Sequence, residues 1–364
     1  MIRFFLPLLM LLSMVNLNAQ NKKPLKVGVV GLTHTHVHWI LGREDRGDIE
    51  IVGIVEPNQD LAQRYMKQHN MSMDLVYPTM EVMVKAVNVE AVTAFGSIYE
   101  HLEVVQFFAP RGIHVMVEKP LAVSMEHATE MARLAKQHNI HLLTNYETSW
   151  YATNKEAYEM VRAGKLGTLR KVIVRDGHEG PIEIGVNQEF LDWLTDPVQN
   201  GGGAVTDFGC YGANLTTWLT QGKRPVSVTA ITKTYKPEKY PKVDDEAVIL
   251  LEYEDMTAIL EASWNWPFNR KDMEVYGATG YVISDNGSDM RVRLAGEDRA
   301  TAMKADPLPA AINDPFALLT SVIKDGFKIE DHDVSALANN LLVVEILDAA
   351  KESARTGKKV LLEK

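Results

Sequence analysis

The feature that most constrains the fold is an alternation of short apolar runs with amphipathic segments of helical period, which extends from residue 26 to about residue 144. Continuous apolar runs are typical of parallel strands that are buried on both faces. Strands that alternate with helices in this way predict a doubly wound parallel sheet of the Rossmann type. The predicted strands are residues 26–31, 51–56, 91–95, 114–118 and 141–144, and the predicted helices are residues 60–69, 80–86, 100–110 and 124–138.

The pattern changes after about residue 146. The later segments predict helices at residues 155–163, 207–219 and 333–354, and strands at residues 169–175, 226–234, 247–253 and 258–264. Alternating strands joined by short turns suit a mostly antiparallel sheet with one open face. We therefore predict an α/β fold with a nucleotide-binding domain at residues 24–145 and a C-terminal α/β domain at residues 146–364. An open sheet face favours a homodimer or homotetramer.

The first nineteen residues predict a Sec-type signal peptide. Arg3 precedes an apolar run from Phe4 to Val15, and a small residue, Ala19, ends the segment. The run is shorter than the ~20 residues that a membrane-spanning helix needs, so we expect a cleaved leader and no membrane anchor. The predicted location is the periplasm. A single cysteine, Cys210, excludes an internal disulfide.

The charge balance argues against nucleic acid as a partner. The chain has 38 Lys and Arg residues against 48 Asp and Glu residues, with a formal net charge of −10. No block of basic residues offsets this charge locally. An acidic chain of this kind is repelled by phosphate backbones and by anionic membrane surfaces.

The turn after the first predicted strand matches a dinucleotide-binding motif only in part. Gly31 keeps the first glycine of G-x-G-x-x-G, whereas Thr33 and His36 occupy the second and third glycine positions. Glu56 ends the second predicted strand at about the spacing of an acid that binds ribose hydroxyls. A carboxylate there would repel a 2′-phosphate, which favours NAD over NADP. The alternative for Glu56 is a solvated acid at a strand end.

Three histidines in this turn, His34, His36 and His38, raise the alternative of a metal site. No cysteine or acidic residue lies in the same turn, and zinc sites need three or four protein ligands. We therefore predict no metal. We expect His34 and His36 to hydrogen-bond phosphate or substrate instead, with simple polar packing as the alternative.

A second motif ends the fifth predicted strand, where Glu118, Lys119 and Pro120 follow one another, and residues 201–211 read G-G-G-A-V-T-D-F-G-C-Y. With His101 and residues 112–115, 163–167 and 353–357, these segments resemble the glucose–fructose oxidoreductase, inositol dehydrogenase and rhizopine-catabolism (Gfo/Idh/MocA) family. The resemblance covers nearly the whole chain after the leader. It implies a Rossmann domain that binds NAD, a C-terminal α/β domain with an open sheet, and hydride chemistry on sugar hydroxyls.

The resemblance implies that Lys119 lies near nicotinamide and substrate, and that Asp207 is the acid of the substrate-domain helix. Tyr211 stands where many members have histidine. Because tyrosine titrates near 10, a tyrosine base at neutral pH needs a neighbouring cation such as Lys119, with Asp207 orienting the pair. The alternatives are that Tyr211 is a core residue, and that His178 is the base or a hydrogen-bond donor to substrate.

The complete predicted site spans both domains. Cofactor contacts are predicted at Gly31, Thr33, His34, His36, Glu56, Gly96, His101, Glu118 and Lys119. Substrate contacts are predicted at Lys119, Asn145, Trp150, His178, Trp193, Asp207, Tyr211 and Asn214, of which 207, 211 and 214 would share one helix face. The tryptophans are included because sugars bind through aromatic faces.

An exported enzyme meets no free NAD pool, so we expect tightly bound NAD that is regenerated on the enzyme. Three functions remain open. The first is oxidation of a ring hydroxyl of a sugar or glycoside, such as the C3 hydroxyl, to give a keto-glycoside. The second is an NAD-dependent glycosidase with transient redox and net hydrolysis. The third is a non-catalytic sugar-binding relative.

Overall fold

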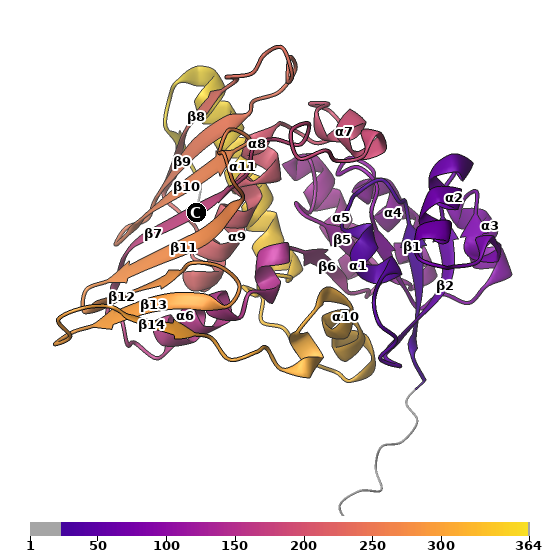
Figure 1. Cartoon of the computed structure of the whole chain (residues 1–364), viewed down its shortest axis with the longest axis horizontal. Helices are drawn as coiled ribbons and strands as arrows, with labels where there is room; N and C mark the ends of the chain where they lie inside the picture. The colour runs from indigo at the N-terminus through magenta and orange to yellow at the C-terminus, as the bar shows by residue number, and fades with distance from the viewer. Residues whose placement is uncertain (1–22, 363–364) are drawn as a thin grey trace, which may run out of the picture.

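The computed structural model describes residues 23–362, so the predicted signal peptide at residues 1–19 lies outside the described residues. Two β-sheets lie on opposite sides of the molecule, with helices packed between and around them (Figure 1). Within residues 23–362, no helix combines the length and the hydrophobicity that crossing a bilayer requires.

The first sheet has six strands in the order β3-β2-β1-β4-β5-β6, and every neighbouring pair is parallel. Its strands are β1 (Leu25–Val30), β2 (Ile49–Val55), β3 (Val76–Tyr77), β4 (Ala91–Ala94), β5 (His114–Glu118) and β6 (Leu142–Asn145). The strand order reverses between β1 and β4, and ligands of such sheets bind in the crevice beyond the carboxyl ends of the strands at this point. The predicted doubly wound parallel sheet is confirmed.

Helices cover both faces of this sheet. Apolar residues of α1 (Val37–Leu41), α2 (Gln59–Gln68) and α10 (Pro315–Lys324) pack on one face, and those of α3 (Met80–Ala86), α4 (His101–Phe108) and α5 (Met125–Gln137) pack on the other. Helix α10 belongs to the C-terminal part of the chain, yet Phe316 and Leu319 share a core with Val27 and Val29 of β1. The predicted boundary after residue 145 therefore does not separate the two cores completely.

The second sheet has nine strands in the order β14-β13-β12-β11-β7-β10-β9-β8-β15. Only the pair β7–β10 is parallel, which confirms the prediction of a mostly antiparallel sheet. Its strands are β7 (Leu169–Gly177), β8 (Ser227–Lys233), β9 (Glu246–Glu252), β10 (Thr257–Ser263), β11 (Arg270–Gly277), β12 (Gly280–Ser284), β13 (Asp289–Leu294), β14 (Thr301–Lys304) and β15 (Val360–Leu361).

One face of the second sheet is covered by helices and the other is open. Helices α9 (Gly209–Leu219) and α11 (Leu337–Thr356) share the sheet's hydrophobic core, and α6 (Ala152–Arg162) packs beside them (Figure 1). Ile231, Val248 and Leu250 are exposed large hydrophobic residues of β8 and β9. The predicted homodimer or homotetramer stays a prediction.

The predicted helix over residues 207–219 is interrupted. Helix α8 (Ala204–Asp207) ends before Phe208, and α9 begins at Gly209. A Cβ at Gly212 would lie 2.9 Å from the Leu260 side chain, so this glycine lets α9 pack closely on β10. Asn214 is fully buried and its side-chain amide donates to the Val334 carbonyl oxygen. Asn214 therefore joins α9 to the segment that precedes α11, and its predicted contact with substrate is wrong.

A segment of the C-terminal part, residues 187–200, crosses to the carboxyl edge of the first sheet. It contains α7 (Gln188–Leu194), whose Glu189 forms a 2.6 Å ion pair with Arg64 of α2. At its far end the Ser97 hydroxyl, just after β4, donates to the Gln199 side-chain oxygen over 2.7 Å. This crossing segment brings residues of both halves of the chain to the crevice at the strand-order reversal.

Candidate active site

A first cavity of about 290 Å³ lies at the crevice between the ends of β1, β2 and β4. Gly31 and Gly96 line it from the turns that follow β1 and β4. Gly31 has a φ of +78°, and a Cβ at this position would lie 2.8 Å from the Gly96 backbone nitrogen. The first glycine of the motif is therefore required both by its backbone conformation and by the close approach of the two turns.

His101 gives this first cavity an unpartnered polar atom. The side chain is fully buried, its Nδ1 lies 3.1 Å from the Leu121 carbonyl oxygen, and its Nε2 has no hydrogen-bond partner. Burial lowers the pKa of His101 to about 4, so the ring is neutral and Nε2 accepts a hydrogen bond. A hydroxyl of a bound ribose would satisfy this nitrogen. The adenosine half of a dinucleotide fits the cavity by these features.

Glu56 lies at the end of β2 but its carboxylate faces the glycine turn. It accepts the backbone N–H of Leu32 over 2.9 Å and that of Asn58 over 2.8 Å, and the residue is 3% exposed. The alternative of a solvated strand-end acid is therefore wrong. Glu56 does not line the first cavity, so its predicted contact with ribose stays a prediction, while its bonds show that it closes the turn after β1.

The turn after β1 is tied to the end of β4. The backbone N–H of His34 donates to the Phe95 carbonyl oxygen over 2.8 Å, and the Thr33 hydroxyl donates to the same oxygen over 3.3 Å. Trp193 of the crossing segment donates its indole N–H to the Thr33 hydroxyl over 3.0 Å. A backbone N–H that a conventional turn offers to phosphate is thus used within the protein. Phosphate contacts by Thr33 and His34 stay predictions.

A second cavity of about 320 Å³ lies beyond the end of β5, between the two halves of the chain. Lys119 lies there, with Nζ 2.5 Å from Asp207 Oδ1 and 3.1 Å from the Asp207 carbonyl oxygen. The Trp264 indole N–H donates to the other carboxylate oxygen, Oδ2, over 3.0 Å. The structure therefore brings the two predicted residues into contact. Both Lys119 and Asp207 are at least nine-tenths buried.

The ion pair keeps both partners charged. Burial alone would raise the pKa of Asp207, but the Lys119 ammonium outweighs this effect and lowers the pKa to about 2. Burial alone would lower the pKa of Lys119, but the Asp207 carboxylate outweighs it and raises the pKa. Lys119 is therefore a permanent cation and hydrogen-bond donor at neutral pH, and it does not act as a base.

Tyr211 lines the same cavity, and its predicted role as base stays a prediction. Lys119 Nζ lies 5.1 Å from the centre of the Tyr211 ring and Lys271 Nζ lies 5.3 Å from it, so both ammonium groups face the ring. Burial, followed by the negative charge of Glu147, raises the pKa of Tyr211 well above its usual value. The lowered pKa that a tyrosine base needs is not found in this state of the site, where Asp207 pairs with the Lys119 charge.

Three histidines line the second cavity: His34, His36 and His178. The Nδ1 of His178 accepts the backbone N–H of Gly180 over 2.9 Å, and burial lowers its pKa to about 4. A neutral ring whose Nδ1 is an acceptor carries its proton on Nε2. His178 is therefore placed as a hydrogen-bond donor, which was one of its two predicted roles.

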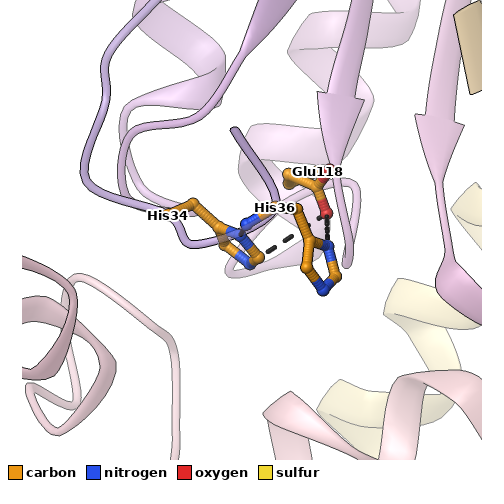
Figure 2. A group of neighbouring side chains, drawn as sticks. All are labelled: His34, His36 and Glu118. Atoms are coloured by element: carbon orange, nitrogen blue, oxygen red, sulfur yellow. Dashed lines mark hydrogen bonds and ion pairs between the residues drawn. The ribbon is translucent and has the colours of Figure 1, made fainter. Parts of the chain in front are cut away.

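His34, His36 and Glu118 form a compact group, with the histidines on the turn after β1 and Glu118 at the end of β5 (Figure 2). His36 Nδ1 lies 2.8 Å from Glu118 Oε2, and His34 Nε2 lies 4.0 Å from the same oxygen. These are ligand types that metals use. The argument against a metal assumed that no acid is near, and Glu118, 82 residues after His36, removes that premise. The absence of a metal stays a prediction.

Asn145 and Trp150 support Glu118 instead of lining the second cavity. The Asn145 side-chain amide donates to Glu118 Oε1 over 2.6 Å, and its oxygen accepts the Trp150 indole N–H over 3.0 Å. Trp193 is 8% exposed and covers the turn after β1. The predicted substrate contacts at Asn145, Trp150 and Trp193 are therefore not found in this cavity. The two indole groups were predicted to bind substrate because the sequence does not show that their N–H groups bond to Asn145 and Thr33.

Lys271 and Phe190 are among the lining residues of the second cavity that sequence reasoning missed. Lys271 of β11 lines it and forms an ion pair with Glu147, and Phe190 of α7 forms part of its apolar wall. Lys271 occupies an ordinary position in an alternating strand, and Phe190 lies in a short helix without a motif. No local signal marks either residue, because both reach the site only through the pairing of β11 with β7 and the path of the crossing segment.

Comparison with known proteins identifies the family. Residues 25–146 match the family described as oxidoreductase family, NAD-binding Rossmann fold, and residues 154–283 match the GFO/IDH/MocA C-terminal domain. The two matches cover well over half of the chain, so the protein belongs to the Gfo/Idh/MocA family of oxidoreductases. It is an enzyme of the dehydrogenase type with an NAD-binding Rossmann domain.

Several relatives are similar over much of the chain. Trans-1,2-dihydrobenzene-1,2-diol dehydrogenase of Xenopus tropicalis is 22% identical over 313 residues, which cover 83% of this chain and 89% of the relative. Rhizopine catabolism protein MocA of Rhizobium meliloti is 26% identical over 230 residues, which cover 62% of this chain and 66% of the relative.

Solved structures show the same fold. Aldose-aldose oxidoreductase from Caulobacter crescentus, complexed with glycerol, has a TM-score of 0.78 at 24% identity and covers 93% of this chain and 100% of its own. An inositol dehydrogenase homolog from Azotobacter vinelandii, complexed with NAD⁺, has a TM-score of 0.79 at 17% identity and covers 93% and 98%. At these sequence identities the similarity shows a shared fold, and it assigns no role to any individual residue.

Proposed function

We propose that this protein oxidises a ring hydroxyl of a sugar or glycoside, the C3 hydroxyl being one candidate, to a keto-glycoside with bound NAD. The observation that carries the proposal is the buried Lys119–Asp207 ion pair, which lines a cavity at the end of β5 in an NAD-binding Rossmann fold. When bound, NAD⁺ supplies the acceptor for the hydride that leaves the alcohol carbon.

The residues of the second cavity have distinct tasks in this reaction. The Lys119 ammonium donates a hydrogen bond to the substrate oxygen and stabilises the negative charge that develops there. Asp207 holds that ammonium in place and is itself held by Trp264. His178 donates from Nε2 to a hydroxyl of the substrate, while Phe190 and other apolar residues exclude water. The volume of about 320 Å³ lies within the usual range for small-molecule sites.

We infer that the cofactor is NAD and not NADP. Three carboxylates, Glu81, Glu100 and Glu103, line the first cavity, and neither a lysine nor an arginine is among its lining residues. A 2′-phosphate on the adenosine ribose would lie in this negative field without a cation to neutralise it. The preference for NAD is therefore supported by the three carboxylates of the cavity wall and not by Glu56 alone.

We also propose that NAD is retained between turnovers. The crossing segment is fastened to the turn after β1 by Trp193 and to the turn after β4 by Gln199. A cofactor under this segment leaves only when these contacts open. Retained NAD suits an exported enzyme in the periplasm, where a second sugar would take the hydride back. The open face of the second sheet supports the proposal of a homodimer or homotetramer.

A second candidate function is a non-catalytic sugar-binding protein on the same scaffold. The observation that favours it is the His34 N–H bond to Phe95, which uses a backbone donor that a conventional cofactor turn offers to phosphate. The cofactor content of the purified protein separates the two candidates, because a sugar-binding protein of this kind would hold no dinucleotide.

Mass spectrometry of the products tests the proposed function. The full chain, purified after export, is incubated with a panel of glucosides and a second aldose as hydride acceptor. The proposed function predicts a glycoside product that has lost two hydrogens and keeps its glycosidic bond. A free reducing sugar without a keto product would support the NAD-dependent glycosidase instead, and no mass change with any glucoside would contradict the proposal.

A further inference from the structure

The second cavity contains one histidine whose hydrogen bonds differ from those of its neighbours. The backbone N–H of His36 donates to His34 Nδ1 over 3.1 Å, and the Gly180 N–H donates to His178 Nδ1 over 2.9 Å. An Nδ1 that accepts a hydrogen bond has no proton, so the Nε2 atoms of neutral His34 and His178 carry it. Both rings are therefore donors at Nε2 and have no lone pair to offer there.

His36 has the opposite arrangement. Its Nδ1 lies 2.8 Å from Glu118 Oε2. Burial raises the pKa of Glu118, while His34, the hydrogen bond from Asn145 and the Lys119 charge lower it. With Glu118 ionised, its oxygen accepts and the His36 Nδ1 donates. The proton of the neutral ring is thereby fixed on Nδ1, and Nε2 keeps its lone pair. The second ring nitrogen of His36 points away from Glu118 in Figure 2, and His36 lines the second cavity together with Lys119. The structure shows no hydrogen-bond partner for this Nε2 within residues 23–362.

Glu118 is itself held in place. It is 1% exposed, its Oε1 accepts the Asn145 amide over 2.6 Å, and Asn145 accepts the Trp150 indole N–H over 3.0 Å. The His36 ring also stacks on Trp39, with ring centres 3.8 Å apart and planes 15° apart. A carboxylate that orients an imidazole and stabilises its protonated form is a recurring device for general bases.

We propose that His36, oriented by Glu118, is the group that takes the proton of the substrate hydroxyl. This inference rests on the proposed function, and it reassigns His36 from cofactor contact to proton acceptor. The O–H bond of the substrate breaks and its proton goes to His36 Nε2. The adjacent C–H bond breaks and its hydrogen leaves with the electron pair to the nicotinamide of NAD⁺, so a C=O bond forms and NADH balances the electrons. Lys119 donates to the same oxygen throughout.

The surroundings of His36 keep its ring neutral. Burial lowers the pKa of His36 well below its usual value, and the Lys119 and Lys271 ammonium groups lower it further, against the opposing charges of Glu147 and Asp207. The ring is therefore neutral and ready to accept at neutral pH. Activity that depends on this base is retained above the lowered pKa and is lost as the pH falls through it, so kcat/KM has an acidic limb well below the usual pKa of histidine.

The first experiment measures the tautomers of the resting enzyme by ¹⁵N NMR of histidine-labelled protein. His36, identified as the resonance pair missing from His36→Gln, is expected to carry its proton on Nδ1. In Glu118→Gln, the amide oxygen accepts from Asn145 and the new NH₂ donates to His36 Nδ1, so the proton is expected on Nε2. A wild-type His36 that carries its proton on Nε2 overturns the proposal, and so does an unchanged tautomer in Glu118→Gln.

The second experiment measures kcat/KM against pH with the glycoside that wild type oxidises. His36→Gln is expected to lower kcat by about 10²–10⁴-fold and to remove the acidic limb. Glu118→Gln is expected to lower kcat similarly without releasing the dinucleotide. His38→Gln is the matched control, because its ring bonds to His69 and does not line the cavity, and it should keep both kcat and the acidic limb.

The outcomes separate this inference from the proposed function. A His36→Gln variant that keeps kcat within tenfold and retains the acidic limb overturns the role of His36 alone. A wild-type enzyme that oxidises no glycoside overturns the proposed function and the proton transfer with it, whereas the NMR result still reports on the Glu118–His36 pair. One divalent metal ion per wild-type chain that is lost in both variants would show a metal centre and overturn the proposal.

Discussion

The two cavities at the carboxyl edge of the first sheet differ in what forms their walls. The first, between β1 and β4, is shaped by close backbone approach at Gly31 and Gly96 and contains carboxylates without cations. The second, beyond β5, is shaped by long side chains from both halves of the chain and contains Lys119 paired with Asp207. The first is suited to holding the neutral adenosine half of a cofactor, and the second to stabilising charge during a reaction.

This difference explains how the chain can keep both cavities although two of the three glycines of the G-x-G-x-x-G motif are replaced. Between the two cavities, Thr33 and His34 replace the usual open turn and bond directly to Phe95. Gly31 still lines the first cavity and His34 lines the second, so both cavities are present beside the altered turn. The comparison teaches that a turn with one of the three motif glycines can still border two cavities, whose other walls come from separate parts of the chain.

The largest effect is expected from Lys119→Met in the second cavity. The variant removes the cation that stabilises charge on the substrate oxygen, so kcat/KM should fall by about 10³-fold, near the upper end for loss of one such donor. It also leaves the Asp207 carboxylate unpaired and buried, which should lower the free energy of unfolding by about 3–5 kcal/mol. Steady-state kinetics and urea denaturation measure the two effects.

A double variant separates stability from catalysis at this position. Lys119→Met combined with Asp207→Asn removes both charges, so most of the lost stability should return while turnover stays low. Unchanged turnover in Lys119→Met would contradict the catalytic assignment of the second cavity. A double variant as unstable as the single one would contradict the account of the ion pair.

A smaller effect is expected from Gly31→Ala in the first cavity. The left-handed backbone should cost about 1–2 kcal/mol, and the added Cβ, 2.8 Å from the Gly96 nitrogen, should push the two turns apart. Gly47→Ala is the matched control, because Gly47 has a φ of +71° and open space around its Cβ position. If both variants show the same decrease in the free energy of unfolding and the same dinucleotide content, the close approach of Gly31 to Gly96 does not shape the cavity.

The smallest effect is expected from Trp193→Phe in the crossing segment. The variant loses the indole hydrogen bond to the Thr33 hydroxyl but keeps an aromatic ring against His34 and Phe190. A loss of about 1 kcal/mol should speed dinucleotide release roughly fivefold and leave the rate of the chemical step unchanged. The rate is measured by trapping released NAD with a second enzyme. An unchanged release rate would show that this segment does not retain the cofactor.

Much of the fold was predictable because its signals are local. The Val- and Ile-rich runs that became β1, β2, β4 and β5 are continuous, and the helices between them have clear caps, such as Ser124 before α5. Helix α10 and strand β11 were missed, since a short amphipathic segment and an ordinary alternating strand do not show which sheet they will join. The break at Phe208 was missed although Gly209 follows it directly, because a single glycine does not show where a helix is interrupted.

The candidate site was predictable where a motif carries it. Lys119 and Asp207 lie in two recognisable segments, and the structure brings them together as expected. The surroundings of Tyr211 and His36 could not be predicted, since they depend on which groups the tertiary structure places beside each side chain. Lys119 Nζ lies 5.1 Å from the centre of the Tyr211 ring, and Glu118 reaches His36 across 82 residues of sequence. Such contacts are set by tertiary packing alone.

The central claim is that a hydride passes from a sugar carbon in the second cavity to a dinucleotide that extends from the first. The most direct measurement gives the purified protein one equivalent of the glycoside that it oxidises, with deuterium on the carbon to be oxidised, and then denatures it. The account predicts that mass spectrometry of the released dinucleotide finds NADH that carries one deuterium. A protein that releases no dinucleotide, or only unlabelled NAD while the glycoside is converted, would contradict it.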